Sequence, residues 1–358
     1  MQATTDISRA SRIKGAIMGA FVGDALALGP HWYYDLDELR RVYGEIDGYT
    51  APQPGRYHAG LPAGASSQAG VILELTLRSL VESGGYDETD FCRRMDEDLF
   101  PQMDGEPMSG PGGYTSESIR NAWRQRQAGV PWGQLASLAD NTEAAERILA
   151  IAVRYAGQPQ KLAQHVSANV ALTQRDPTVG AMTLAYAAVL GRLVQGDALD
   201  AGLSGRLMGM VKAGELPFHT VTSGELSMPH GREAPLEAGQ FPSPDALLTV
   251  SSIADGVQNR GVVIDPAWKV SLVYGLPCAI YHQMPAVYHL AARFQGDFEP
   301  AVLAAVNGGG QNLARALLTG ALCGAIGGFE AIPQRFIDGL QKADTYLQLA
   351  ESLARQAA

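Results

Sequence analysis

The sequence predicts an all-α protein. Apolar residues recur at steps of three and four through most long segments, which is the pattern of helices with one buried face. No segment alternates with the two-residue period of a strand. Apolar residues make up 46% and charged residues 18%, as in globular proteins, and 358 residues allow one large domain or two ordinary ones.

The first helix is expected over about 9–27. Ile13, Ala16, Ile17 and Phe21 form its apolar stripe. Similar spacing predicts further helices, in chain order, over 72–81, 148–155, 182–194, 270–281, 313–326 and 336–353.

Glycines are spaced unusually for a helical protein. Two sets fall every fourth residue near the two ends of the chain: Gly15, Gly19, Gly23, Gly320, Gly324 and Gly328. Each glycine inside a helix costs about 0.5–1 kcal/mol relative to alanine. Their faces must therefore be approached closely, either by another helix or by a ligand.

Two stretches rich in proline, glycine and polar residues predict long irregular loops. They lie near 101–114 and 217–244. Long ordered loops in globular domains are usually lids, binding loops or insertions.

Composition argues against several function classes. The net charge is −10 and no block of Lys and Arg is present, so we expect no nucleic-acid partner. Three widely spaced cysteines indicate reduced thiols and a cytoplasmic protein. The N-terminus lacks a secretory pattern, and the apolar stretches are too short and interrupted for a membrane span.

One candidate pocket wall follows the first helix. Asp24 ends a glycine-faced segment, and His31 and Trp32 lie in the turn beyond it. These side chains offer charge, a titratable ring and a stacking surface. Asp24 could equally accept hydrogen bonds from loop amides.

Two predicted helix starts carry polar residues. Ser67 and Gln68 precede one helix, and Asn141, Thr142 and Glu143 precede another. Such residues cap helices, and free N–H groups at these positions also favour anions. Both interpretations remain open from the sequence.

A run of three glycines stands before the helix at 313–326. Gly308, Gly309 and Gly310 give a flexible backbone whose N–H groups could face a phosphate or ribose, and Gln311 and Asn312 add neutral amides. This run matches neither a Walker loop nor a dinucleotide-binding fingerprint. No His, Cys, Asp or Glu cluster has metal-ligand spacing.

Four segments resemble the ADP-ribosylglycohydrolase family, in the same order. Residues 12–26, from Arg-Ile-Lys-Gly-Ala to Gly-Asp-Ala-Leu, resemble its opening signature, and 301–333 resemble its last motif. Residues 140–142 (Asp-Asn-Thr) resemble its Gly-Asn-Gly stretch, and 171–177 its Leu-Thr-His-x-His-Pro stretch. The resemblance implies a single compact all-α domain over 1–358 that binds ADP-ribose beside two magnesium ions and cleaves an N- or O-glycosidic bond.

The chain departs from this family at the metal site. The resemblance places a Thr-Asp-Asp run at 67–69, which here reads Ser-Gln-Ala, and an Asp-x-Asp-Thr run at 311–314, which reads Gln-Asn-Leu-Ala. Magnesium requires anionic oxygen ligands, so we expect no metal centre and no cofactor. A similar departure is found in the J-type lens crystallins and a neighbouring selenoprotein group, which the 307–316 segment resembles.

The sequence therefore predicts a metal-independent hydrolase for an ADP-ribosyl, ribosyl or other small polar ligand. Asp24, His31 and Glu143 are the predicted catalytic residues. The predicted ligand-binding residues are Ser67, Gln68, Tyr114, Asn141, Thr142, Gly308, Gly309, Gly310, Gln311 and Asn312. The alternatives are a non-catalytic ligand-binding or crystallin-like protein, and an ordinary dimagnesium enzyme whose metal ligands lie elsewhere.

Overall fold

The computed structural model describes residues 7–104, 116–219 and 237–357. Its α-helices, in chain order, are α1 (Arg9–Ala27), α2 (Leu36–Tyr43), α3 (Gln68–Glu82), α4 (Glu88–Arg94), α5 (Glu117–Gln127), α6 (Glu143–Arg147), α7 (Leu149–Arg154), α8 (Pro159–Ala171), α9 (Pro177–Val194), α10 (Leu203–Lys212), α11 (Asp245–Gln258), α12 (Val270–Tyr274), α13 (Ile280–Phe294), α14 (Phe298–Asn307), α15 (Asn312–Gly327), α16 (Gln334–Gly339) and α17 (Ala343–Gln356). The described parts of the chain contain no β-strand, only two isolated bridges. The predicted all-α class is confirmed.

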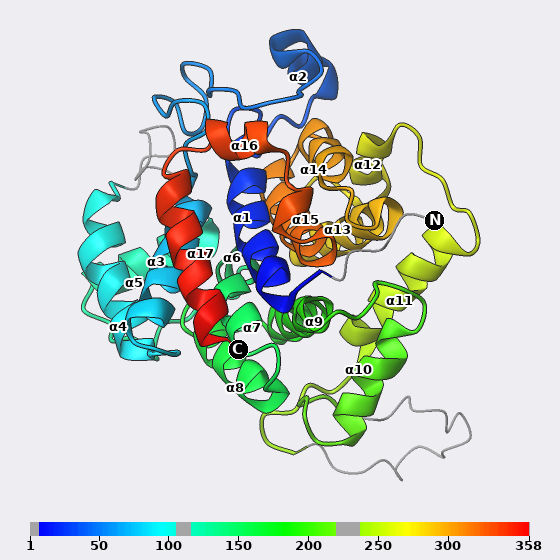
Figure 1. Ribbon diagram of the computed structural model, residues 1–358. Coiled ribbons are helices and arrows are strands. Elements are labelled where there is room, and N and C mark those ends of the chain that lie inside the picture. The colour runs from blue at the N-terminus through cyan, green and yellow to red at the C-terminus, as the bar shows by residue number, and fades with distance from the viewer. Residues whose placement is uncertain (1–6, 105–115, 220–236, 358) are drawn as a thin grey trace.

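Two helices from opposite ends of the chain form the centre of the domain. Figure 1 shows α1 and α15 side by side, with α17 on the other side of α1. A β-carbon on Gly19 would overlap the Gly320 carbonyl oxygen, and one on Gly15 would overlap the Gly324 carbonyl oxygen. The spaced glycines thus let two helix backbones touch, which settles the open alternative in favour of helix packing.

One large hydrophobic core joins most of the helices. It includes side chains of α1, α3, α7, α9, α13, α15 and α17. A smaller cluster lies between α3, α4 and α5, with Phe91, Met95 and Ile119 at its centre. The polar network described below lies next to both clusters.

Two predicted helices are interrupted in the structure. The segment 270–281 is divided into α12 and the start of α13, because Gly275 has a φ of 121° and Pro277 follows it. The segment 336–353 is divided into α16 and α17, and Lys342 between them has a φ of 59°. Apolar periodicity continues through both breaks, so the prediction of continuous helices was wrong.

The predicted loops fall mainly outside the described residues. Near 101–114 only 101–104 are described, and near 217–244 only 217–219 and 237–244. Phe218 pairs with Phe241 in an isolated bridge that closes the base of the second loop.

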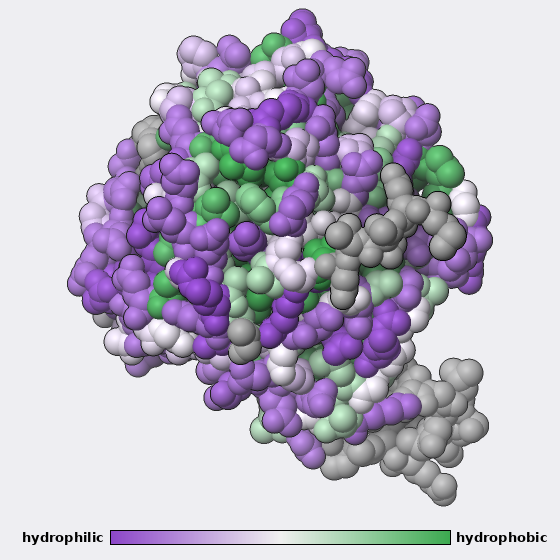
Figure 2. All heavy atoms as spheres, in the orientation of Figure 1, coloured by the Kyte–Doolittle hydropathy of each residue, from purple (hydrophilic) through white to green (hydrophobic). Residues whose placement is uncertain are grey.

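The apolar helix α9 has the length and hydropathy of a membrane span. Two thirds of it (67%) is buried by neighbouring helices, as in the core helix of a globular domain. Figure 2 shows a mainly hydrophilic face, with apolar residues gathered in a few smaller areas.

Candidate functional site

A small polar cavity lies where several helices begin. The starts of α3, α6 and α15 meet the turn after α1 and the loop that carries His58. The cavity measures about 40 Å³. Its lining residues are His31, Trp32, His58, Ser67, Gln68, Ala69, Ile72, Ser116, Asn141, Thr142, Glu143, Glu146, Gln311 and Leu313.

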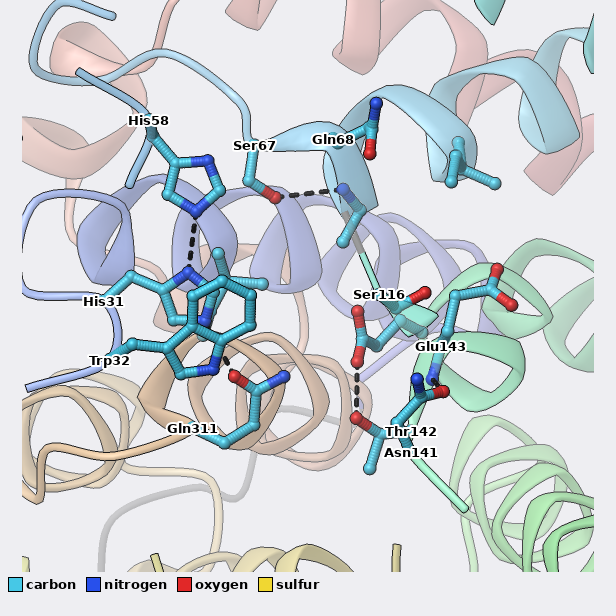
Figure 3. A pocket seen from close by; sticks show the side chains of 14 residues that line it. His31, Trp32, His58, Ser67, Gln68, Ser116, Asn141, Thr142, Glu143 and Gln311 are labelled. Atoms are coloured by element: carbon cyan, nitrogen blue, oxygen red, sulfur yellow. Dashed lines mark hydrogen bonds between the residues drawn. The ribbon is translucent and has the colours of Figure 1, made fainter. Parts of the chain in front are cut away.

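Two histidines and a glutamine form a hydrogen-bonded chain along one side of the cavity (Figure 3). His31 Nδ1 lies 2.7 Å from His58 Nε2, and His31 Nε2 lies 2.7 Å from the Gln311 Oε1 atom. The amide oxygen can only accept, so His31 donates from Nε2 and accepts at Nδ1 from His58. Burial and the neighbouring His58 hold the His31 pKa well below its usual range, and burial lowers the His58 pKa to about 4. Both rings are therefore neutral at pH 7.

The cavity wall next to these two histidines has an unusual backbone conformation. Trp32 stacks on the His31 ring at 3.9 Å, and Trp32 and His58 have φ values of 60° and 64°. Bulky residues in the left-handed region cost of order 1–3 kcal/mol each, and the surrounding structure must hold them there. The Trp32 backbone is held in part by its own amide N–H, which donates to the Gly310 carbonyl at 3.1 Å.

Asp24 lies behind the cavity rather than on its surface. Its carboxylate accepts hydrogen bonds from the Ser67 backbone N–H at 2.9 Å and the Ser67 hydroxyl at 2.5 Å. Ser67 in turn caps α3, because its Oγ accepts from Ala69 N–H at 3.0 Å. Burial raises the Asp24 pKa to about 7 despite the hydrogen bonds to Ser67. Asp24 therefore fixes the start of α3, consistent with the acceptor role considered from the sequence.

Glu143 is part of a buried ion pair under the opposite wall. Its Oε1 binds the Arg147 guanidinium, and its Oε2 accepts from Ser118 Oγ at 3.2 Å and Thr173 Oγ1 at 3.0 Å. Arg147 also donates to the Asn169 side chain at 2.8 Å. Both Glu143 oxygens are thus engaged, and the Arg147 guanidinium is the charged partner of this carboxylate.

Glu146 was not identified from the sequence, although it lines the cavity. It stands one turn beyond Thr142, whose hydroxyl donates to Glu146 Oε1 at 2.5 Å. Burial, followed by the charges of Glu143 and Asp24, raises the Glu146 pKa to about 8. A carboxyl group three residues after Glu143 was a possible signal, but the sequence also allowed an ordinary charged helix face.

Several neutral amides complete the polar surface. Neither amide atom of Gln68 has a hydrogen-bond partner, although the residue is only 3% exposed. Figure 3 shows the Gln311 amide nitrogen on the side away from His31, toward Thr142 and Asn141. Asn141 Oδ1 accepts from Gln174 Nε2 at 3.1 Å. Gln68 and Gln311 are therefore two amides with hydrogen-bonding capacity left for a ligand.

The structure brings seven of the predicted site residues to the cavity, and the other predicted residues that it describes do not line it. The seven are His31, Ser67, Gln68, Asn141, Thr142, Glu143 and Gln311. Asn312 donates to the carbonyls of Pro30 and Val306 at 3.1 and 3.2 Å. Tyr114 lies outside the described residues.

The three glycines pack against protein rather than against the cavity. Gly309 N–H donates to the Val306 carbonyl at 3.3 Å, and Gly310 N–H donates to the Tyr33 carbonyl at 2.7 Å. A β-carbon on Gly308 would come within 3.0 Å of Arg315 and Ser271. The glycine run thus shapes a turn, and its predicted ligand-binding role stays a prediction, as do the roles of the residues at the cavity.

Ala314 does not line this cavity, but the other five positions that the resemblance assigns to magnesium do. They are Ser67, Gln68, Ala69, Gln311 and Leu313. None carries a carboxylate, two carry no donor atom, and the Gln311 oxygen is already engaged by His31. The described residues hold no group of three or more His, Cys, Asp or Glu side chains that could bind a metal. This donor set does not fit a hard divalent cation.

One family model matches nearly the whole chain, and a relative and a solved structure are similar over the same length. The ADP-ribosylglycohydrolase family model matches residues 5–358. An uncharacterised protein of Archaeoglobus fulgidus is 24% identical over 345 residues, covering 96% of this chain and 95% of its own. A solved structure described as an ADP-ribosylglycohydrolase-related protein complex has a TM-score of 0.65 and 20% identity, covering 98% of this chain and 99% of its own.

Proposed function

Because this chain belongs to the ADP-ribosylglycohydrolase family, we propose that it hydrolyses the glycosidic bond of a small ribosyl or ADP-ribosyl ligand without a bound metal. The observation that carries this proposal is the cavity. Five of the positions that would hold magnesium face it, and the side chains there are a hydroxyl, two amides and two apolar groups. Carboxyl groups nevertheless remain beside them, at Glu143 and Glu146.

The neutral amides are suited to binding a sugar. Gln68 offers one donor group and one acceptor that no described residue satisfies, and the Gln311 nitrogen is oriented by the bond of its oxygen to His31. A sugar hydroxyl both donates and accepts, so it can satisfy such groups where an ion cannot. His31 acts in this proposal as a positioning residue, because both of its ring nitrogens are engaged.

The cavity must enlarge to admit a sugar. A volume of 40 Å³ accommodates about three water molecules, at roughly 10–15 Å³ of accessible volume for each. Trp32 is the lining side chain with the largest surface, and its backbone already lies in the costly left-handed region. We propose that a rotation of Trp32 away from His31 provides the additional volume.

The test is turnover and stabilisation with and without metal. Phenyl β-riboside and an ADP-ribosylated peptide serve as substrates, in EDTA and in magnesium. Activity that is equal in both conditions supports the proposal, whereas activity that appears only with magnesium contradicts it. ADP-ribose at 100 times its Kd is expected to stabilise the fold by about 2.7 kcal/mol in EDTA.

Restoring the carboxylates provides a matched control. Asp at positions 68, 69, 311 and 313 gives back the family's metal ligands, through Gln68→Asp, Ala69→Asp, Gln311→Asp and Leu313→Asp together. Magnesium is expected to raise the Tm of this variant and to leave that of the natural sequence unchanged. A magnesium-dependent rise in the natural sequence would show that the metal is bound by other residues.

A non-catalytic ligand-binding or crystallin-like role is the second candidate. The small cavity and the apolar side chains of Ala69 and Leu313 favour it. Stabilisation by ADP-ribose without turnover of either substrate would support this candidate over the hydrolase.

A further inference from the structure

The acidic side chains around the cavity differ in how many of their oxygens are engaged. Both Asp24 oxygens bind Ser67, and both Glu143 oxygens bind Arg147, Ser118 or Thr173. Glu146 accepts one hydrogen bond, from Thr142 at Oε1, and no described residue binds its Oε2. Glu146 is therefore the cavity carboxyl with an oxygen left for a ligand.

The charges around Glu146 favour its protonated form. Asp24 on α1 and Glu143 on α6 oppose a second negative charge, and a Cys278 thiolate would do the same. Arg147 is the compensating cation, but its donors are directed to Glu143 and Asn169. Glu146 itself is only 5% exposed, so water screens its interactions with these charges little.

The remaining titratable groups of the cavity do not compete for this role. His31 and His58 are hydrogen-bonded to each other, and their lowered pKa values leave them uncharged at pH 7. A proton for a leaving group must therefore come from a carboxyl group rather than from an imidazolium.

We infer that Glu146 is the general acid of the proposed hydrolysis, donating its proton from Oε2 to the leaving-group atom of the ribosyl bond. The inference rests on the proposed function. The bond from the anomeric carbon to the leaving oxygen or nitrogen breaks, and the Glu146 proton passes to that atom. Water adds its oxygen to the anomeric carbon, and the proton it loses returns to the Glu146 carboxylate. The products are the free sugar and the protonated leaving group, with no oxidation or reduction.

Thr142 and Glu143 assist through position and charge. The Thr142 hydroxyl holds Oε1, which directs Oε2 to the opposite side of the carboxyl group. Glu143 lines the cavity and its partner Arg147 does not, so the negative end of this ion pair faces the place where positive charge develops on a ribosyl ring during bond cleavage.

The experiment compares leaving groups in a Glu146→Gln variant. Phenyl β-riboside has a poor leaving group that needs a proton, whereas 2,4-dinitrophenyl β-riboside departs without one. We expect kcat for the phenyl riboside to fall by about 10² to 10⁴, with a much smaller decrease for the dinitrophenyl riboside. Glu74→Gln is the matched control, because Glu74 is also a buried carboxyl but lies away from the cavity, paired with Arg78 and Lys342.

The pH dependence provides a second readout. With a Glu146 pKa of about 8, the phenyl riboside activity of the natural sequence is expected to fall above pH 8, and the variant is expected to lack this alkaline decrease. Equal losses for both ribosides, or an unchanged variant, would overturn the role of Glu146 and leave the hydrolase proposal intact. If the natural sequence cleaves neither riboside nor the ADP-ribosylated peptide, the proposed function fails, and the role of Glu146 fails with it.

Discussion

Replacing Glu146 by Gln should change how the stability of the fold depends on pH. The Glu146 pKa rises from 4.5 to about 8 on folding. Below pH 4.5 the carboxyl is protonated in both states and contributes nothing. Between pH 4.5 and 8 the unfolded chain releases the proton while the folded chain keeps it, so Glu146 destabilises the fold progressively as pH rises. Above pH 8 both states are ionised and the effect is constant.

The magnitude follows from the width of this interval. Each pH unit contributes about 1.4 kcal/mol, so between pH 5 and pH 8 the variant should gain about 4 kcal/mol relative to the natural sequence. Asp24 acts in the same direction, with a pKa raised to about 7, and leaves a residual slope in both proteins. The free energy of unfolding of the variant should therefore fall less steeply with pH than that of the natural sequence, but it should still fall.

Urea unfolding followed by far-ultraviolet circular dichroism at pH 5, 6, 7 and 8 measures this difference. The Glu74→Gln control removes a buried carboxylate that is paired with Arg78 and Lys342 away from the cavity, so it reports the general effect of replacing a buried carboxylate by an amide. A Glu146→Gln difference that stays constant across the four pH values would refute the reasoning, since it would mean that Glu146 is ionised in the fold at pH 5.

Three further substitutions test the packing and the polar network. Gly19→Ala should destabilise the fold by about 1–3 kcal/mol, because the added β-carbon overlaps the Gly320 carbonyl. Gly205→Ala, in open space on α10, is the control and should stabilise the fold by about 0.5–1 kcal/mol. Thermal unfolding of both variants measures the two effects. Glu143→Gln should cost about 3–5 kcal/mol in urea unfolding, because it leaves a buried guanidinium unpaired, and a loss below 1 kcal/mol would contradict that pairing. Gln68→Leu should raise the Tm of the free protein, since burying two unsatisfied amide atoms costs about 1–3 kcal/mol. The same variant should lose the stabilisation by ADP-ribose. A lower Tm would show that the Gln68 amide is satisfied in the natural sequence.

The helices could be predicted where the apolar stripe ended at the same residue as the helix. The predicted bounds of 9–27 agree with α1 because the stripe that starts at Ile13 follows a serine cap and ends before the turn at 28–32. The stripes over 270–281 and 336–353 continue through their breaks, and at 270–281 the periodicity predicts one helix although Gly275 and Pro277 are visible breaker residues. Gly275 and Lys342 adopt left-handed backbone there, and a lysine in that conformation has no sequence signal.

The site could be predicted in part, because polar helix starts are visible in a sequence and their convergence is not. Ser67, Thr142 and Gln311 stand at the starts of three helices far apart in the chain, and only packing shows that they line one cavity. His58 was missed for the same reason, since it lies in a loop with no motif. Glu146 was missed because its environment, rather than its spacing, distinguishes it from a surface glutamate.

The contact between α1 and α15 bears on how the domain keeps its shape whichever side chains line the cavity. In a site closed by ions, the ions themselves cross-link the segments that carry their ligands. Here Gly15 and Gly19 place backbone against backbone, so the helix that leads to Asp24 and the helix that follows Gln311 are held together independently of the cavity. The contact that holds α1 and α15 together is thus separate from the side chains that line the cavity. Cavity side chains that make no buried ion pair, such as Gln68, can therefore be exchanged without separating the two central helices, which makes this scaffold a favourable starting point for engineering new binding sites.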